Sequence, residues 1–120
     1  MTKEFVPYEL ALKLKQLGFD EPCFAWYVSE SYGLAYGEAV KSDLIKDGIV
    51  APTFSQAFRW FREKQFLIDV TSLNSDEYEF YIKWSFAYSF LSDIYKTYEE
   101  AELACLDKLI EIVELKQREQ

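Results

Sequence analysis

The pattern of apolar positions near the start of the chain predicts a helix. Leu10, Leu14 and Leu17 recur at helical spacing, and the next residue, Gly18, favours the left-handed conformation that ends helices. A proline is well tolerated in the first turn of a helix, because the missing N–H would have no partner there. The sequence therefore predicts a helix over residues 7–17.

A short apolar run follows and predicts a buried strand. Residues 23–28 are apolar, aromatic or β-branched and come directly after an Asp-Glu-Pro turn. The pattern then weakens, because glycines interrupt the stretch up to residue 51. We expect at most a second strand near residues 34–36 and irregular structure over 40–50.

The centre of the chain predicts a second helix and a hairpin. Thr53 and Gln56 have the spacing of a capping box, so a helix is expected over residues 54–64. Residues 66–71 predict a strand, and residues 78–85 alternate between their two faces after an Asn-Ser-Asp turn, which indicates an antiparallel pair. The alternation continues beyond residue 85, and because such a long strand is rare, we expect a bend near residues 85–89.

The C-terminal segment predicts the longest helix. Thr97 and Glu100 form another capping box, and residues 98–116 contain no glycine or proline. The apolar residues of this segment fall into two adjacent stripes, Leu103/Leu106/Ile110/Val113 and Ala101/Cys105/Leu109/Ile112.

These elements predict one α+β domain over residues 1–120. The chain has 120 residues, of which 50% are hydrophobic, so it is long enough to bury one core. We expect an antiparallel sheet, built from the first strand or strand pair and the hairpin at 66–85, covered by three helices with a long C-terminal helix.

Charge and cysteine content narrow the partners and the compartment. Thirteen basic and twenty-one acidic residues give a net charge of −8, which disfavours nucleic acids and anionic membranes because both attract Lys and Arg. The basic residues at 59, 62 and 64 are interpreted as the solvated face of a helix. Cys23 and Cys105 have apolar neighbours, as buried thiols of a reducing compartment do. No run of residues suits a signal peptide or membrane helix, so we expect a cytoplasmic location without membrane contact.

The chain is poor in catalytic groups. It contains no histidine, which excludes Ser-His-Asp relays and imidazole-ligated zinc. The carboxylate pairs Asp20/Glu21 and Glu77/Glu79 are interpreted as solvated turn residues, and no calcium-loop or phosphate-loop spacing is present. We therefore expect no enzyme activity, no catalytic residues, no metal site and no cofactor.

Aromatic residues are the compositional anomaly, because Phe, Tyr and Trp together make up 18% of the chain. Most must lie in the core, and Trp26, Phe58, Phe61, Phe80, Ile82 and Trp84 fall on the expected inward sides. Others fall on opposite faces or in loops, where they either cap the core edge or form a protein-binding patch. The candidate binding residues are Tyr27, Tyr32, Tyr36, Trp60, Tyr81 and Tyr88.

Four segments carry a resemblance to a known family. They are residues 5–11, 18–23, 51–64 and 98–113, and they are similar to a family of small uncharacterised proteins from phages and prophages of Bacteroides-type gut bacteria. The resemblance implies a phage-derived gene and a bacterial cytoplasm. It implies no activity, ligand or site residue.

Two functional hypotheses follow. The first is a non-enzymatic phage or prophage accessory protein that binds a host or phage protein through an aromatic-rich surface. The alternative is an acidic DNA mimic that inhibits a DNA-binding host protein through carboxylates aligned on one face, with Glu100, Asp107, Glu111 and Glu114 as its candidate row. A hydrolase is a third and more distant hypothesis. Self-association into a homo-oligomer is left open.

Overall fold

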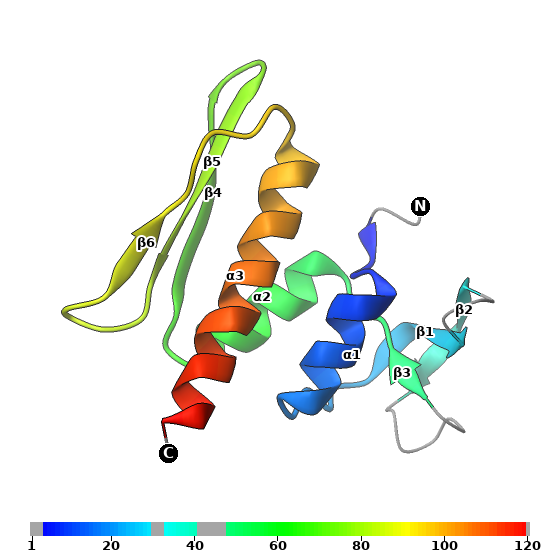
Figure 1. Cartoon of the computed structure of the whole chain (residues 1–120). Coiled ribbons are helices and arrows are strands. Elements are labelled where there is room, and N and C mark those ends of the chain that lie inside the picture. Colours follow the sequence, from blue (N-terminus) through cyan, green and yellow to red (C-terminus); the bar gives the residue numbers. More distant parts are fainter. Residues whose placement is uncertain (1–3, 30–32, 41–47, 120) are drawn as a thin grey trace. The chain divides into compact units, whose positions relative to one another are not determined.

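A computed structural model describes residues 4–29, 33–40 and 48–119, and these residues form an α+β structure (Figure 1). The predicted α+β class and long C-terminal helix are confirmed. The elements are α1 (Tyr8–Gln16), β1 (Cys23–Ser29), β2 (Gly33–Val40), β3 (Ile49–Val50), α2 (Phe54–Glu63), β4 (Leu67–Asn74), β5 (Glu77–Lys83), β6 (Ser89–Leu91) and α3 (Tyr98–Arg118).

The strands form two three-stranded antiparallel sheets instead of the one sheet expected. Their orders are β2-β1-β3 and β4-β5-β6. Each strand pairs with a partner from its own half of the chain, and the chain divides into two compact units, Met1–Ala57 and Phe58–Gln120. The single domain over residues 1–120 stays a prediction.

In the first unit, α1 begins and ends where the sequence predicts. Pro7 is its extended N-cap, and Gly18 has a φ of +104°, which is the left-handed conformation that glycine adopts most readily. The turn after α1 is held by the N–H of Phe19, which donates to the carbonyl of Leu14 at 2.9 Å. Leu10 and Leu14 are buried, so the predicted apolar stripe faces the core of this unit.

The first strand, β1, is present as predicted, but its buried face is the opposite of the one expected. Cys23, Ala25 and Tyr27 are buried, whereas Phe24 and Val28 are 68% and 53% exposed. Adjacent side chains on a strand point to opposite faces, so this choice moves Tyr27 into the core. There the Tyr27 ring meets the Tyr8 ring edge-to-face at 5.4 Å, and its hydroxyl donates to the carbonyl oxygen of Val6 at 2.7 Å.

The Tyr27 hydroxyl gives a stability prediction. Tyr27→Phe should lower the free energy of unfolding by about 1–3 kcal/mol, because it leaves the Val6 carbonyl without this buried donor. Urea denaturation of the two chains measures the difference. Tyr36→Phe is the matched control in the neighbouring strand, where the side chain is 50% exposed, and it should change the free energy of unfolding by less than about 0.5 kcal/mol. Equal effects of the two substitutions would contradict this account.

The region after β1 contains more strand than expected. The strand expected near residues 34–36 extends over Gly33–Val40 as β2, and Ile49–Val50 form β3 where irregular structure was expected. Residues 41–47 lie outside the described residues. β3 pairs with the central strand β1 through Trp26↔Val50 and Tyr27↔Ile49, and both of its residues are buried. Although β3 is an outer strand of this sheet, it consists of two buried apolar residues and therefore shows no alternation.

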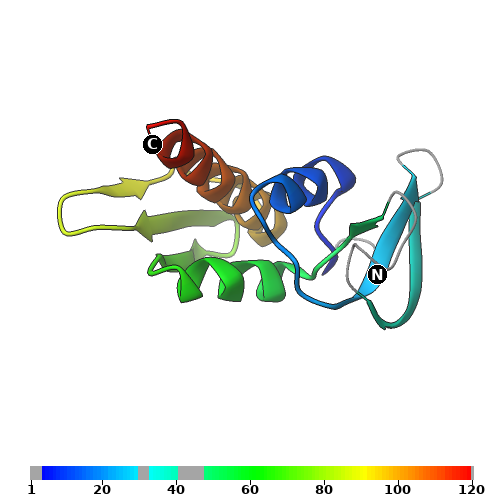
Figure 2. The same ribbon diagram turned by 90° about the horizontal axis from the view of Figure 1, so that it is seen from below.

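In the second unit, the predicted hairpin is confirmed. β4 and β5 pair from Leu67↔Lys83 to Asn74↔Glu77, and the Asn74 side-chain oxygen accepts from the N–H of Asp76 at 3.0 Å in the turn. The expected bend is also present, because the chain turns after β5 and returns as β6. Figure 2 shows α3 lying across one face of this sheet, where Phe80 and Ile82 of β5 are buried.

Both predicted N-caps are present. The Thr97 hydroxyl accepts from the N–H of Glu100 at 3.1 Å, and the Thr53 hydroxyl accepts from the N–H of Gln56 at 3.1 Å. The Gln56 side-chain amide reaches the turn before β1, where it donates to the carbonyl of Pro22 at 3.0 Å. On α3, the second predicted stripe is buried. In the first stripe, Leu106 and Ile110 are buried, whereas Leu103 is 40% exposed.

Candidate functional site

The structure separates the six aromatic residues that the sequence singled out. Tyr27 and Tyr36 belong to the first unit, and Trp60, Tyr81 and Tyr88 belong to the second. Tyr32 lies outside the described residues. Tyr36 and Tyr88 are 50% and 63% exposed, Tyr81 is half-buried, and Tyr27 and Trp60 are buried.

The expectation that Tyr27 and Trp60 are surface aromatics is therefore wrong. The reversed face of β1 explains Tyr27. Trp60 is only 8% exposed because its ring packs edge-to-face on Phe61 at 5.0 Å, while the ammonium of Lys64 lies 4.3 Å from its ring centroid. The buried face of α2 is thus wider than the spacing of its phenylalanines suggests.

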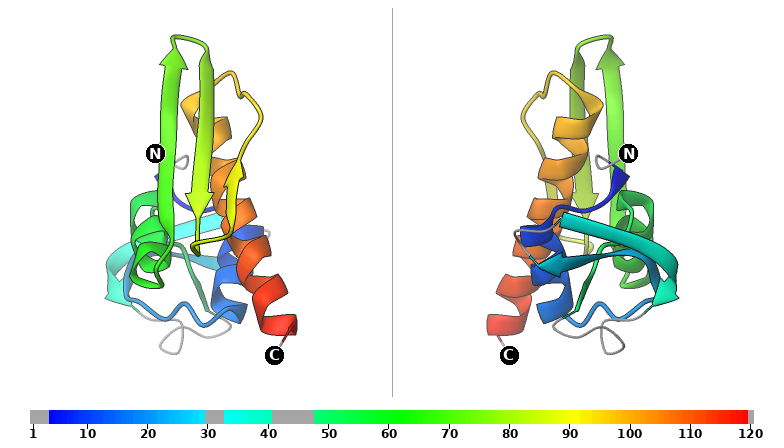
Figure 3. Two further views of the ribbon diagram at one scale, coloured as in Figure 1. Left: turned by 90° about the vertical axis from the view of Figure 1, so that its left-hand side faces the viewer. Right: turned by 90° about the vertical axis from the view of Figure 1, so that its right-hand side faces the viewer.

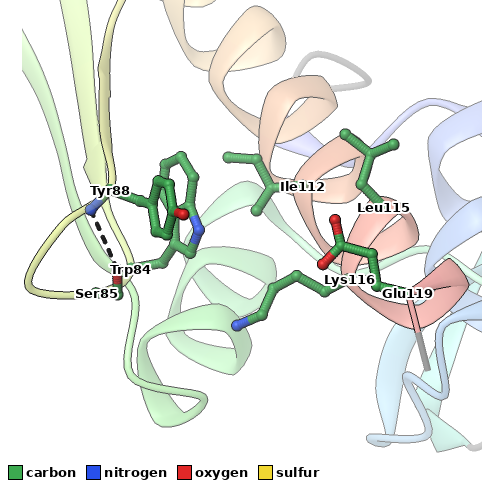
Figure 4. A pocket seen from close by; sticks show the side chains of 7 residues that line it. All are labelled: Trp84, Ser85, Tyr88, Ile112, Leu115, Lys116 and Glu119. Carbon is green, nitrogen blue, oxygen red and sulfur yellow. Dashed lines mark hydrogen bonds between the residues drawn. The ribbon is translucent and has the colours of Figure 1, made fainter.

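A pocket of about 400 Å³ lies in the second unit, between the β5–β6 turn and the last turns of α3 (Figure 4). It contains Tyr88 from the predicted set and Trp84, which the sequence placed in the core. The lining residues are Trp84, Ser85, Tyr88, Ile112, Leu115, Lys116 and Glu119.

The β5–β6 turn supplies the aromatic wall of the pocket. The rings of Trp84 and Tyr88 stack with centroids 6.1 Å apart and planes 12° apart. The backbone fixes this arrangement, because the N–H of Trp84 donates to the carbonyl of Tyr88 at 3.2 Å. The Ser85 hydroxyl also accepts from the N–H of Tyr88 at 3.1 Å and from that of Ala87 at 3.3 Å. Serine favours such turns through its own hydroxyl, so the local sequence determines where both rings lie.

The opposite wall comes from α3. Ile112 and Leu115 are three residues apart and therefore share one face of the helix, and Figure 4 shows both side chains on the side of the pocket opposite the stacked rings. Leu115 is 47% exposed. Lys116 and Glu119 continue this wall, and the Lys116 ammonium lies 5.8 Å from the centroid of the Phe66 ring. The pocket thus combines apolar walls with one positive and one negative side chain.

Apolar surface continues beyond the pocket. Phe86, in the middle of the β5–β6 turn, is fully exposed, and Leu91 of β6 is 59% exposed. Phe86 is not among the candidate binding residues predicted from the sequence. The signal was present, because residues 84–90 alternate aromatic residues with serine and alanine, and a strand with this alternation would place all four rings on one face.

The two thiols are buried and free, as predicted. Burial raises the pKa of Cys105 to about 12, against the opposing effect of the nearby Arg62 guanidinium. Burial, together with Glu21, also raises the pKa of Cys23 to about 12. A thiol must lose its proton to act as a nucleophile, so neither cysteine is activated for covalent chemistry.

One carboxylate of each expected pair has a structural partner. Glu77 accepts from the Asn74 side-chain amide in the hairpin turn, and Glu21 accepts from the Gln56 side-chain amide at 3.4 Å. Burial raises the pKa of Glu102 on α3. Within residues 4–29, 33–40 and 48–119, no group of three or more Cys, Asp or Glu side chains could hold a metal ion.

The acidic row on α3 is interrupted by a cation. Glu100, Asp107 and Glu111 are exposed and Glu114 is half-buried. Lys108 lies among them, with its ammonium 3.3 Å from the Glu111 carboxylate and 4.4 Å from the centroid of the Phe90 ring. A mimic of DNA needs an uninterrupted row of negative charge, so the DNA-mimic alternative gains no support from this helix.

None of the helices in the described part of the chain is long and apolar enough to cross a membrane. Comparisons with protein-family models, curated proteins and solved structures found no match.

Proposed function

We propose that this chain is a non-enzymatic accessory protein of phage or prophage type, which binds a host or phage protein in the bacterial cytoplasm. The binding site is the pocket formed by Trp84, Tyr88, Ile112 and Leu115. The phage origin rests on the resemblance of residues 5–11, 18–23, 51–64 and 98–113, and the site rests on the geometry of the second unit.

The stacked pair of Trp84 and Tyr88 is the observation that carries this proposal. Apolar rings left at a surface cost free energy in water, and tryptophan and tyrosine dominate the binding energy of protein interfaces. Here Tyr88 is 63% exposed, and the turn holds both rings in place before any partner arrives. A preformed site loses little conformational entropy on binding.

The chemistry of the pocket indicates what the partner presents. Its walls suit an apolar side chain, and its volume of about 400 Å³ lies in the range of ordinary ligand pockets. The net charge of −8 attracts a basic protein and accelerates its association. We therefore propose a partner segment that inserts an aliphatic or aromatic side chain next to basic residues.

Replacement of Trp84 tests this site. Partners are captured on the immobilised chain from host lysate and from phage-infected lysate, and the affinity for the captured protein is then measured by calorimetry. Trp84→Ala should weaken binding by about 30-fold or more, because it removes one wall of the pocket, as expected for a central aromatic residue worth at least about 2 kcal/mol.

Tyr36→Ala is the control, because it removes an aromatic side chain that is 50% exposed from the other unit. It should leave the affinity unchanged within about threefold. Circular dichroism checks that both variants are folded. Capture of no partner above background, or equal affinities of the two variants, would rule out the pocket as the binding site.

A further inference from the structure

Among the described residues, one edge of the outer strand β4 has no strand partner, because the order of the second sheet is β4-β5-β6 (Figure 3). The direction of its backbone groups follows from β5. The carbonyl of Phe80 accepts from the N–H of Ser92, and the backbone of Tyr78 exchanges two hydrogen bonds with that of Tyr95. The N–H and C=O groups of the even-numbered residues of β5 therefore point away from β4. Backbone groups alternate in direction along a strand. The odd-numbered residues of β4 therefore bond to β5.

The backbone N–H and C=O groups of the even-numbered residues of β4 consequently point outward at the free edge. A direct observation supports this, since the Arg62 guanidinium donates to the carbonyl of Ile68 at 3.1 Å. Arg62 covers that carbonyl, but Val70 and Ser72 follow it on the same edge. Within the described part of the chain, no backbone hydrogen bond joins Val70 or Ser72 to a group beyond this edge.

Unpaired N–H and C=O groups at strand spacing are complementary to another extended strand. The side chains around them do not oppose such pairing. Residues 70–73 are Val, Thr, Ser and Leu, an uncharged stretch in a chain with a net charge of −8. Val70 is half-buried, and the other three residues are exposed.

The edge is self-complementary about Thr71. In an antiparallel pair centred on this residue, Val70 bonds to Ser72 of the second copy in both directions, which gives four backbone hydrogen bonds by symmetry. Thr71 then lies opposite Thr71 of the second copy. Asp69 lies opposite Leu73 of the second copy, so no like charges face each other across the pair.

Charge also favours a second copy in this register. The hairpin turn of one copy, which carries Asp76 and Glu77, comes alongside the start of β4 in the other copy. There Arg62 lies in the last turn of α2 and Lys64 comes directly after the helix, both exposed, and Arg62 lies at this edge through its bond to Ile68. The symmetry places acidic and basic groups together twice, which offsets part of the repulsion between two acidic chains.

We propose that two copies of this chain associate through the free edge of β4, in an antiparallel register centred on Thr71. The two sheets β4-β5-β6 then continue into one sheet across the two-fold axis. This surface is distinct from the pocket, which lies at the β5–β6 turn.

Cysteine trapping tests both the association and its register. Thr71→Cys places two thiols opposite each other at a non-hydrogen-bonded position, where the Cα atoms are about 4.5 Å apart and a disulfide fits. Leu73→Cys is the matched control on the same face, because its two copies lie about 13 Å apart in this register. Under mild oxidation, Thr71→Cys should form a covalent dimer about tenfold faster or more than Leu73→Cys. The native thiols are buried and do not compete.

Sedimentation equilibrium of the reduced wild-type chain over a wide concentration range supplies the second measurement. Ser72→Pro should raise the dimer dissociation constant by about tenfold, because it removes one outward N–H from each copy and with it two hydrogen bonds. The internal ladder is unaffected, since this N–H points away from β5. Ser72→Ala, which retains the N–H, should associate like the wild type.

Rapid trapping at position 71, slow trapping at position 73 and weakening by Ser72→Pro together support the proposal. A wild-type chain that stays monomeric at every concentration overturns it, as does equal trapping at the two positions. Capture of an extended segment of another protein at this edge by a monomeric chain would also overturn it, because the edge would then have a different occupant.

Discussion

Phe80→Ala is expected to lower the free energy of unfolding by about 3–5 kcal/mol and the melting temperature by about 10 °C or more. Phe80 lies in the middle of β5 and is only 2% exposed. Its ring packs against Phe90 with centroids 5.8 Å apart and against Tyr95 at 6.2 Å. Truncation removes this packing and leaves a cavity beneath α3, which the rigid sheet and helix cannot close.

Tyr81→Ala is the control for this prediction, because Tyr81 is the next residue of β5 and points to the opposite face of the sheet. It is half-buried, and its truncation should cost about 1 kcal/mol. Urea titrations followed by circular dichroism at pH 7 give both values. If Phe80→Ala costs no more than Tyr81→Ala, the packing of α3 on this face of β5 is not the main source of stability in the second unit.

The helices were predictable because local chemistry determines them. Thr53 and Thr97 each accept from an N–H of the first helical turn, and Gly18 takes the positive φ that ends α1. The hairpin between β4 and β5 was predictable for the same reason, since its alternation and its Asn-Ser-Asp turn lie within a few residues of each other. These features need no knowledge of the remaining chain.

The buried face of β1 and the number of sheets depend on contacts between distant residues. Trp26 and Tyr27 are both large and aromatic, so hydrophobicity alone cannot show which one faces the core. The contact of Tyr27 with Val6 and Tyr8 settles the choice, and these residues lie far from β1 in the sequence. Likewise, β3 has two residues, and its pairing with β1 is invisible in any local pattern.

The candidate site was predictable only in part. The aromatic excess indicated a binding surface and named Tyr88, which lines the pocket. The other wall comes from Ile112 and Leu115 of α3, where a pattern of periodic apolar residues is equally consistent with burial in a core. Trp84 was assigned to the core because it alternates with Phe80 and Ile82. However, β5 ends at Lys83, so Trp84 lies just beyond the strand and lines the pocket.

The second large effect is expected at alkaline pH. Burial raises the pKa of both Cys23 and Cys105 to about 12, from an ordinary value of 9.0. The folded chain therefore keeps both thiols protonated at a pH where the unfolded chain releases the protons. A raised pKa in the folded state stabilises the fold below the unfolded pKa, and this stabilisation is lost as the pH rises toward the folded pKa. The free energy of unfolding should thus fall between about pH 9 and pH 12.

The expected slope is about 1.4 kcal/mol per pH unit for each thiol, or about 3 kcal/mol per pH unit for the two together. Urea titrations at pH 8, 9.5 and 10.5 measure it in the wild-type chain and in Cys23→Ala, Cys105→Ala and the double variant. Each single substitution should remove about half of the slope that the double substitution removes. Burial also raises the pKa of Tyr27 and Tyr98, and because these tyrosines are present in all four chains, their effect cancels in the comparison. A double variant that loses stability with pH as steeply as the wild type would show that the thiols are not buried as described.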